Sequence, residues 1–123
     1  MKRLSLTALC LVVLVGCGSQ TPADIEQAGP ALRSALDAWK AGWSQKDLEN
    51  QNPSILMNED DWREGRTLVD FQMEPNGVMH GRQVVWWAMI KTKDKKGKIE
   101  ERRAKYVVDT TPRLVIVRDR FAR

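Results

Sequence analysis

The chain has 123 residues, of which 20 are Lys or Arg and 16 are Asp or Glu, so its formal net charge is +4. This length leaves room for one compact domain after an N-terminal signal and excludes a second. With a single His and two Cys, the composition excludes a zinc site built from several such ligands and a scaffold held by several disulfides.

The N-terminus has the pattern of an export signal. Lys2 and Arg3 precede an apolar run over residues 4–15, which ends at Gly16 and Cys17. The run is shorter than the roughly 20 residues that a helix needs to cross a bilayer, which favours a cleaved signal over a permanent anchor. A Cys directly after Leu-Val-Gly is similar to the lipobox of bacterial lipoproteins. That resemblance implies cleavage before Cys17 and lipid attached to its thiol.

Processing at this position would change the chemistry of the chain. The signal removes Cys10 and the lipid occupies Cys17, so no free thiol remains for a disulfide, a metal or a nucleophile. The mature chain keeps 18 basic and 16 acidic side chains, and its formal charge falls to +2. Because Gly18 rather than Asp follows the Cys, the lipoprotein sorting pattern favours the outer over the inner membrane. We predict a signal peptide at 1–16, a lipidated tether at 17–29 and a single α+β domain at 30–123.

The domain is predicted to begin with an amphipathic helix that opens at Pro30. Apolar side chains three or four residues apart form one face of it, comprising Leu32, Ala35, Leu36, Trp39 and Trp43. Ser44 and Asp47 have the spacing of a capping box, which predicts a second, shorter helix through Asn50. Residues 55–57 form only a brief apolar segment.

From Thr67 onward the apolar period changes from 3.6 to 2, which predicts β-strands. Turn signals divide this part into four strands, at 67–73, 82–91, 99–109 and 114–117. Glu74-Pro75-Asn76-Gly77 is expected to reverse the chain after the first of them. A helix followed by antiparallel strands predicts an α+β fold, with the helix packed on a curved four-stranded antiparallel sheet.

Several short motifs lie between residues 31 and 119. They are Trp39 with Gly42, Asp60-x-Trp62-x-x-Gly65, Tyr106-Val107-Val108, Thr111-Pro112 and Arg118-Asp119. With these motifs the chain resembles short bacterial lipoproteins of unassigned activity, and its order of elements resembles the cystatin-like and nuclear-transport-factor-like folds. The resemblance implies a cystatin-like fold and a location in the cell envelope, and it brings no catalytic residues.

Few residues could carry catalysis. His80 lies at an expected hairpin without a nucleophile motif, and we interpret it as a solvated loop residue. By analogy with isomerases of the cone-shaped fold, Asp70 could act as a general base and Tyr106 as a hydrogen-bond donor, if the strand register brings them together. We predict a binding or structural protein that is not an enzyme and needs no cofactor. A small isomerase-like or hydrolase-like enzyme using Asp70 and Tyr106 is the alternative.

The segment Asn58-Glu59-Asp60-Asp61 is the densest group of oxygen ligands, but it lacks the spacing and the Gly of a calcium loop. We predict that Asp60 or Asp61 caps a short turn, with Arg63 and Arg66 as ion partners, and that no metal binds. Calcium binding is the alternative.

Trp86 and Trp87 are adjacent on a predicted strand, so their side chains must point to opposite faces of the sheet. If the helix covers one face, apolar side chains on the other form an exposed patch. We predict a surface for an envelope protein partner or for self-association that draws on Trp86, Trp87, Val107, Val115 and Val117. The alternative is that loops, the segment at Ile55 or the side chain of Trp62 cover this face.

Charge is unevenly distributed along the chain. Residues 17–90 carry 6 basic and 11 acidic side chains, whereas residues 91–123 carry 12 and 5. One predicted turn is crowded with lysines, namely Lys91, Lys93, Lys95, Lys96 and Lys98. They are candidates for contact with anionic headgroups or acidic glycans near the anchor, and the tether is expected to hold them within reach of the membrane. Alternatively they form a solvated hairpin tip. A nucleic acid partner is not expected outside the cell.

Overall fold

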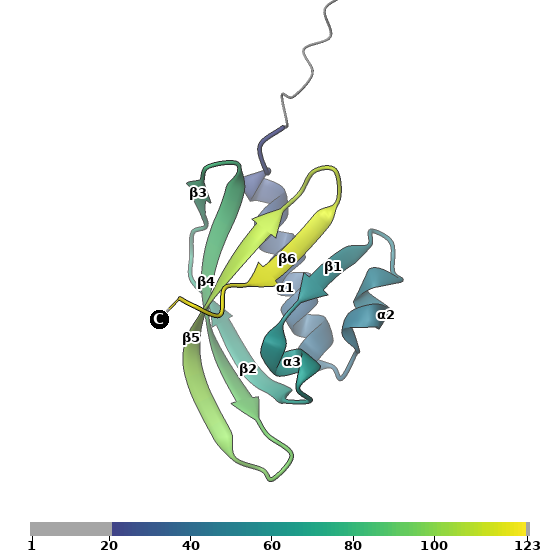
Figure 1. The fold of residues 1–123 in the computed structure, drawn as a ribbon, viewed down its shortest axis with the longest axis vertical. Helices are drawn as coiled ribbons and strands as arrows, with labels where there is room; N and C mark the ends of the chain where they lie inside the picture. The colour runs from purple at the N-terminus through teal and green to yellow at the C-terminus, as the bar shows by residue number, and fades with distance from the viewer. Residues whose placement is uncertain (1–20, 123) are drawn as a thin grey trace, which may run out of the picture.

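The computed structural model describes residues 21–122, so the predicted signal and Cys17 lie outside the described residues. The elements are α1 (Ile25–Lys40), α2 (Gln45–Glu49), β1 (Ile55–Asn58), α3 (Asp60–Arg63), β2 (Thr67–Met73), β3 (Val78–His80), β4 (Gln83–Lys93), β5 (Ile99–Asp109) and β6 (Leu114–Arg118). No helix in residues 21–122 is long and apolar enough to span a membrane. The predicted α+β class is confirmed (Figure 1).

Six strands form one mixed, curled sheet in the order β1-β6-β5-β4-β2. The strands β2, β4, β5 and β6 are antiparallel neighbours, as the sequence predicts. The sheet is nevertheless larger than the four-stranded one expected, because β1 adds a parallel strand beside β6 and β3 pairs with β4. Residues 55–57 are too few to show a strand period, and only the apolar β6 beside them makes them a strand.

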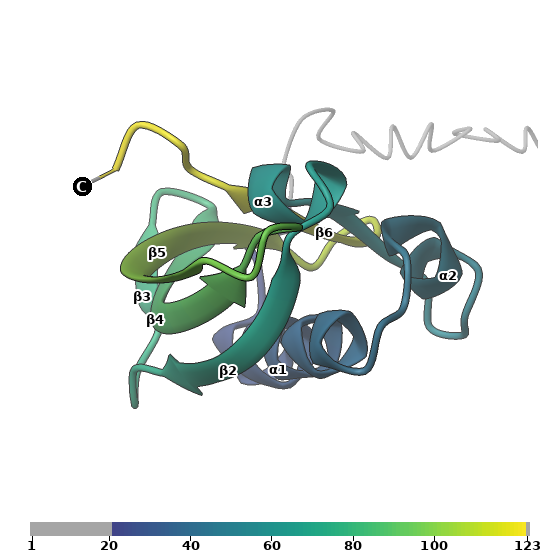
Figure 2. The same ribbon diagram turned by 90° about the horizontal axis from the view of Figure 1, so that it is seen from below.

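The helix α1 packs against one face of this sheet (Figure 2). It begins at Ile25 rather than at Pro30, because the carboxylate of Asp24 accepts the N–H of Glu26 and caps the helix earlier. Ala28 and Gly29 are buried, and this packing offsets the hydrogen bond that Pro30 cannot donate. The segment predicted as a tether therefore contributes its last residues to the folded unit.

Most of the predicted helix face lies in the core, with Leu32, Ala35, Leu36 and Trp39 all buried. Trp43 does not join them, since it is 42% exposed. The reason is that α1 ends at Lys40 and Gly42 has a φ of 91°, a backbone conformation that turns the chain out of the helix.

The strand β2 differs from simple alternation. Its pairing with β4 shifts register between Leu68 and Asp70. This bulge places Leu68 in the core with Phe71, whereas Val69 and Asp70 are both exposed. Simple alternation along residues 67–73 would place Val69 and Phe71 on the same face, and the bulge separates them.

The segment 74–77 does not reverse the chain. After it, β3 continues in the same direction along the edge of β4 that β2 occupies, and the reversal comes at Gly81, which has a φ of 63°. The indole of Trp86 explains the interruption, since its Nε1–H donates to the carbonyl of Glu74 at 2.8 Å and its ring lies against Gly77.

Candidate functional site

A row of valines crosses the sheet on the face turned away from α1. The strand register places Val78, Val85, Val107 and Val117 side by side on β3, β4, β5 and β6. Val85, Val107 and Val117 each alternate with inward residues of the core, and Val78 pairs with Val85, so the row points outward. Val78 is 62% exposed and Val117 is 38% exposed. We call this surface the outer face and define it by Val78, Val85, Trp87, Val107, Val115 and Val117.

The two adjacent tryptophans point to opposite faces, as predicted. Trp86 faces α1 and packs against Gly29, so it is not part of the outer face. Trp87 lies on the outer face, where the guanidinium of Arg103 sits 4.0 Å from the ring centroid and the Lys105 ammonium sits 6.0 Å away. Its ring is therefore partly covered by basic side chains rather than by a loop.

The remaining predicted residues border shallow hollows on the same face. Val107 and Val117 line a hollow of about 620 Å³ together with Phe121, which is 87% exposed. Val115 lines a neighbouring hollow, and Gln83 and Asp109 border both of them. The structure thus brings Trp87 and the three predicted valines onto one face. Sequence reasoning missed Phe121 because it lies beyond the last strand, where no periodicity applies.

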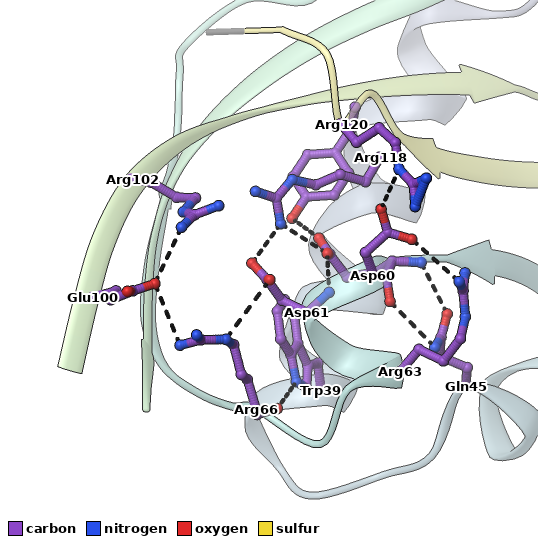
Figure 3. Close-up of polar contacts among 12 residues, drawn as sticks. Trp39, Gln45, Asp60, Asp61, Arg63, Arg66, Glu100, Arg102, Arg118 and Arg120 are labelled. Carbon is purple, nitrogen blue, oxygen red and sulfur yellow. Dashed lines mark hydrogen bonds and ion pairs between the residues drawn. The ribbon is translucent and has the colours of Figure 1, made fainter. Parts of the chain in front are cut away.

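A buried ionic cluster lies at the edge of the outer face (Figure 3). The side chain of Glu59 is fully buried and accepts the hydroxyl hydrogen of Tyr106 at 2.5 Å and an Arg118 N–H at 2.8 Å. Arg118 also donates to Asp61 at 2.7 Å. The cluster joins residues from β5, β6 and the turn before α3, although they are far apart in the sequence.

Burial is the largest single influence on the pKa values of Glu59, Tyr106 and Arg118, and their partners in the cluster act on the pKa values as well. Burial raises the pKa of Glu59, although Arg118 and Tyr106 partly offset the effect. Burial and the neighbouring Glu59 hold the pKa of Tyr106 well above its usual 10. Burial alone would lower the pKa of Arg118, but Glu59 and Asp61 more than compensate and raise it. Because each Glu59 oxygen already accepts hydrogen bonds inside the protein, the cluster ties strands together rather than presenting a free acid or base.

The acidic segment caps a short helix, but the capping residue is not the one predicted. Glu59 is the N-cap of α3, since its carboxylate accepts the N–H of Asp61 at 3.0 Å. The predicted ion partners are confirmed, with Arg63 at 3.2 Å from Asp60 and Arg66 at 3.8 Å from Asp61. Within residues 21–122 no group of three or more His, Cys, Asp or Glu side chains is arranged to hold a metal ion.

Several of the motif residues lie around this corner of the fold, whereas Thr111 and Pro112 lie at the β5–β6 hairpin. The rings of Trp39 and Trp62 stack at a centroid distance of 5.5 Å. Their indole N–H groups donate to backbone carbonyls, Trp39 to Arg66 and Trp62 to Trp43. Together with Tyr106 and Arg118 these contacts give the motifs a structural role. No protein-family model, curated protein or solved structure matches the chain.

Asp70 and Tyr106 do not come together. Asp70 is exposed and lies 3.4 Å from the ammonium of Lys40, and its pKa is lowered by the backbone N–H of Phe71 and by Lys40. Tyr106 is buried against Glu59. In the sheet Asp70 pairs with Lys91, whereas Tyr106 pairs with Trp86 at a different level of β4. His80 is exposed at the β3–β4 hairpin, as expected.

The five lysines gather at the β4–β5 hairpin, at the opposite end of the sheet from the start of α1 and the β3–β4 hairpin (Figure 1). The end of β4, the start of β5 and the start of β2 meet at this hairpin, whereas the chain enters the fold beside Arg82 at the other end of β4. This placement does not support the expectation that the tether holds the lysines against the membrane.

Proposed function

We propose that the protein is a lipid-anchored lipoprotein of the bacterial cell envelope with a non-catalytic binding role, and that a partner protein binds its outer face. The anchor rests on the lipobox pattern at Cys17, and the residue after it favours the outer membrane. The binding role rests on the row of valines that crosses four strands beside the exposed Phe121. Contiguous apolar surface of this kind is typical of protein interaction sites.

The side chains of the outer face are not part of the hydrophobic core. Its buried side chains come from the inward positions of the sheet, from the helices and from Ala23, so the outward valines contribute little to folding. The charged residues around the row, including Arg103, Lys105, Asp109 and Arg120, would form a polar rim of the kind that surrounds the apolar centre of protein interfaces.

A binding role fits the geometry better than catalysis does. Glu59 and Tyr106, whose pKa values burial raises, are hydrogen-bonded to each other and buried. Asp70 is exposed and ion-paired with Lys40. We also propose that the fold is a cystatin-like variant, supported by α1 lying against the β2-β4-β5-β6 meander, with β1 as an additional edge strand.

Site-specific photo-crosslinking in intact cells tests the binding role. A photoreactive residue at position 107 should give a discrete adduct, and one at position 69 should not. Val69 supplies a control, because it is exposed yet lies on β2 outside the valine row. An adduct with twice the mass of the chain would identify a second copy as the partner.

The substitution Val117→Asp should reduce the adduct from position 107 at least fivefold, whereas Val69→Asp should leave it unchanged. Urea unfolding of both variants would show that neither has lost its fold. Equal adducts from positions 107 and 69, or none from position 107, would contradict a binding role for the outer face.

A further inference from the structure

The point where the chain enters the domain is held firmly. Ala23 is buried, and its N–H donates to the carbonyl of Arg82 at 2.8 Å. The N–H of Asp24 donates to the hydroxyl of Thr110, also at 2.8 Å. The entry therefore lies between the β3–β4 hairpin and the β5–β6 hairpin. Five residues separate Ala23 from Cys17, and even fully extended this segment reaches only about 20 Å.

The lysine-rich hairpin lies at the other end of the longest strands (Figure 1). The strand β4 runs from Gln83, beside the chain entry, to Lys93 at the hairpin and has 11 residues. At a rise of about 3.3 Å per residue it spans about 35 Å. With lipid on Cys17, the entry end is held near the bilayer and the hairpin end extends away from it. We call the hairpin end, residues 91–99, the distal tip.

The distal tip carries positive charge that no ion pair within residues 21–122 neutralises. It contains five lysines and one acidic residue, Asp94, whose carboxylate accepts the backbone N–H groups of Lys96 and Lys98. In residues 21–122 none of these lysines lies within ion-pair distance of a carboxylate. The nearby Glu100 is engaged by Arg66 and Arg102.

The distal tip has little apolar surface to offer a protein partner. Among the described residues, Ile99 is the only large apolar side chain of the tip that is exposed. Protein interfaces depend on an apolar centre with a few large anchors, which the tip lacks. Lys side chains act as hydrated point charges on flexible stems, and several of them along a hairpin suit a repeating anionic polymer better than a single small ligand.

We infer that the distal tip points away from the anchoring membrane and binds an anionic polysaccharide, while the bilayer that holds the lipid contacts the opposite end. The proposed orientation depends on the proposed lipid anchor at Cys17. The proposed ligand class depends on the charge of the tip and not on the anchor.

Fluorescence energy transfer to labelled headgroups tests the orientation. The mature chain has no free thiol once Cys17 carries lipid, so Arg113→Cys and Lys96→Cys each introduce a single labelling site at opposite ends. Both positions are exposed basic residues of hairpins. With the lipidated protein in vesicles, we expect transfer from position 113 to exceed that from position 96 at least twofold. Equal transfer would mean that the domain lies flat on the membrane and would overturn the orientation.

The same experiment separates this inference from the proposed anchor. If the processed protein does not associate with vesicles, the anchor is wrong, and the orientation falls with it. If it associates and position 96 transfers as strongly as position 113, the anchor stands and only the orientation fails. A Cys17→Ser variant, which should stay in solution, provides the blank.

Binding to polygalacturonate, a carboxylate polysaccharide, tests the ligand class, with neutral dextran as the blank. The triple substitution Lys95→Gln, Lys96→Gln and Lys98→Gln should weaken binding at least tenfold at 50 mM salt. The matched triple Arg33→Gln, Lys46→Gln and Arg113→Gln removes the same charge elsewhere and should weaken it less than threefold. Affinity of the unchanged protein should fall as salt rises. No binding, or equal losses in both triples, would overturn the inference.

Discussion

Glu59 has the most demanding environment of any charged residue described in the structure. Its side chain has no solvent exposure, yet it accepts hydrogen bonds from Tyr106, Arg118 and the backbone of Asp61. A buried carboxylate is costly unless it is paired and hydrogen-bonded. Each of these partners is therefore expected to matter for stability.

Replacing Tyr106 by Phe removes the hydroxyl that donates to Glu59 and leaves a buried acceptor with one partner fewer. We expect a loss of about 1–3 kcal/mol in the free energy of unfolding, measured by urea denaturation. The exposed Arg63, which pairs with Asp60, serves as a control, since Arg63→Gln should cost less than about 0.5 kcal/mol. Equal effects of the two substitutions would mean that the Tyr106 hydrogen bond stabilises the protein no more than an exposed ion pair does.

The raised pKa of Glu59 predicts how stability depends on pH. Because burial raises the pKa above the 4.5 of the unfolded chain, the contribution of Glu59 is fully present below pH 4.5 and is lost as pH rises through the raised pKa. The lowered pKa values of Asp47, Asp70 and Asp94 act in the opposite sense and only below about pH 4.

Urea unfolding of the unchanged protein between pH 4.5 and 8 should therefore show a fall in stability that Glu59→Gln abolishes, since the amide does not ionise. The comparison needs only the difference between the two proteins at each pH. A difference that stays constant over this range would show that Glu59 does not titrate there.

At the level of elements, the side chain of Trp86 links α1, β4 and the segment between β2 and β3. The ring of Trp86 is enclosed by two glycines, Gly29 on α1 and Gly77 before β3. A Cβ atom at Gly29 would lie 2.9 Å from the Trp86 ring, and one at Gly77 would overlap with it. The glycines are thus required by close packing, which explains why 74–77 wraps around the indole instead of reversing the chain.

Gly77→Ala should consequently destabilise the protein by about 1–3 kcal/mol, as overpacking of a well-filled site does. The neighbouring Asn76 is exposed, so Asn76→Ala should change the free energy of unfolding by less than about 0.5 kcal/mol. Urea denaturation followed by circular dichroism measures both. If Gly77→Ala behaves like Asn76→Ala, the Trp86 ring has room to move and the close packing is not essential.

For the whole molecule, the sheet separates surfaces of different character. Charge without apolar anchors is concentrated at the distal tip, the chain enters at the opposite end, and the apolar row crosses the outer face nearer to the chain entry. This separation predicts that the distal tip contributes to binding and not to folding.

Replacing Lys93, Lys96 and Lys98 by Gln should therefore leave the free energy of unfolding unchanged, or raise it by up to about 0.5 kcal/mol at low salt, because repulsion among the lysines is relieved. Urea unfolding at 20 mM and 500 mM salt measures this, and the difference should vanish at the higher salt. A loss above 1 kcal/mol would show that these lysines support the fold.

Much of the fold follows from local sequence pattern. The spacing of Leu32, Leu36 and Trp39 predicted the buried face of α1, and strict alternation predicted that Trp86 and Trp87 point to opposite faces. The valines of the outer face were identified in part by the same alternation. These features depend on residues close in the chain, where the period of a helix or strand alone decides which side chains share a face.

Other features were decided only by the tertiary structure. Residues 55–58 become a strand because β6 lies beside them, and Val69 leaves the core because of a bulge in β2. The partners of Glu59 come from residues 106 and 118, and the valine row needs the register of four strands. Such contacts join segments distant in the sequence, so no local period encodes them. A shift of one residue in pairing would turn every side chain of a strand to the other face.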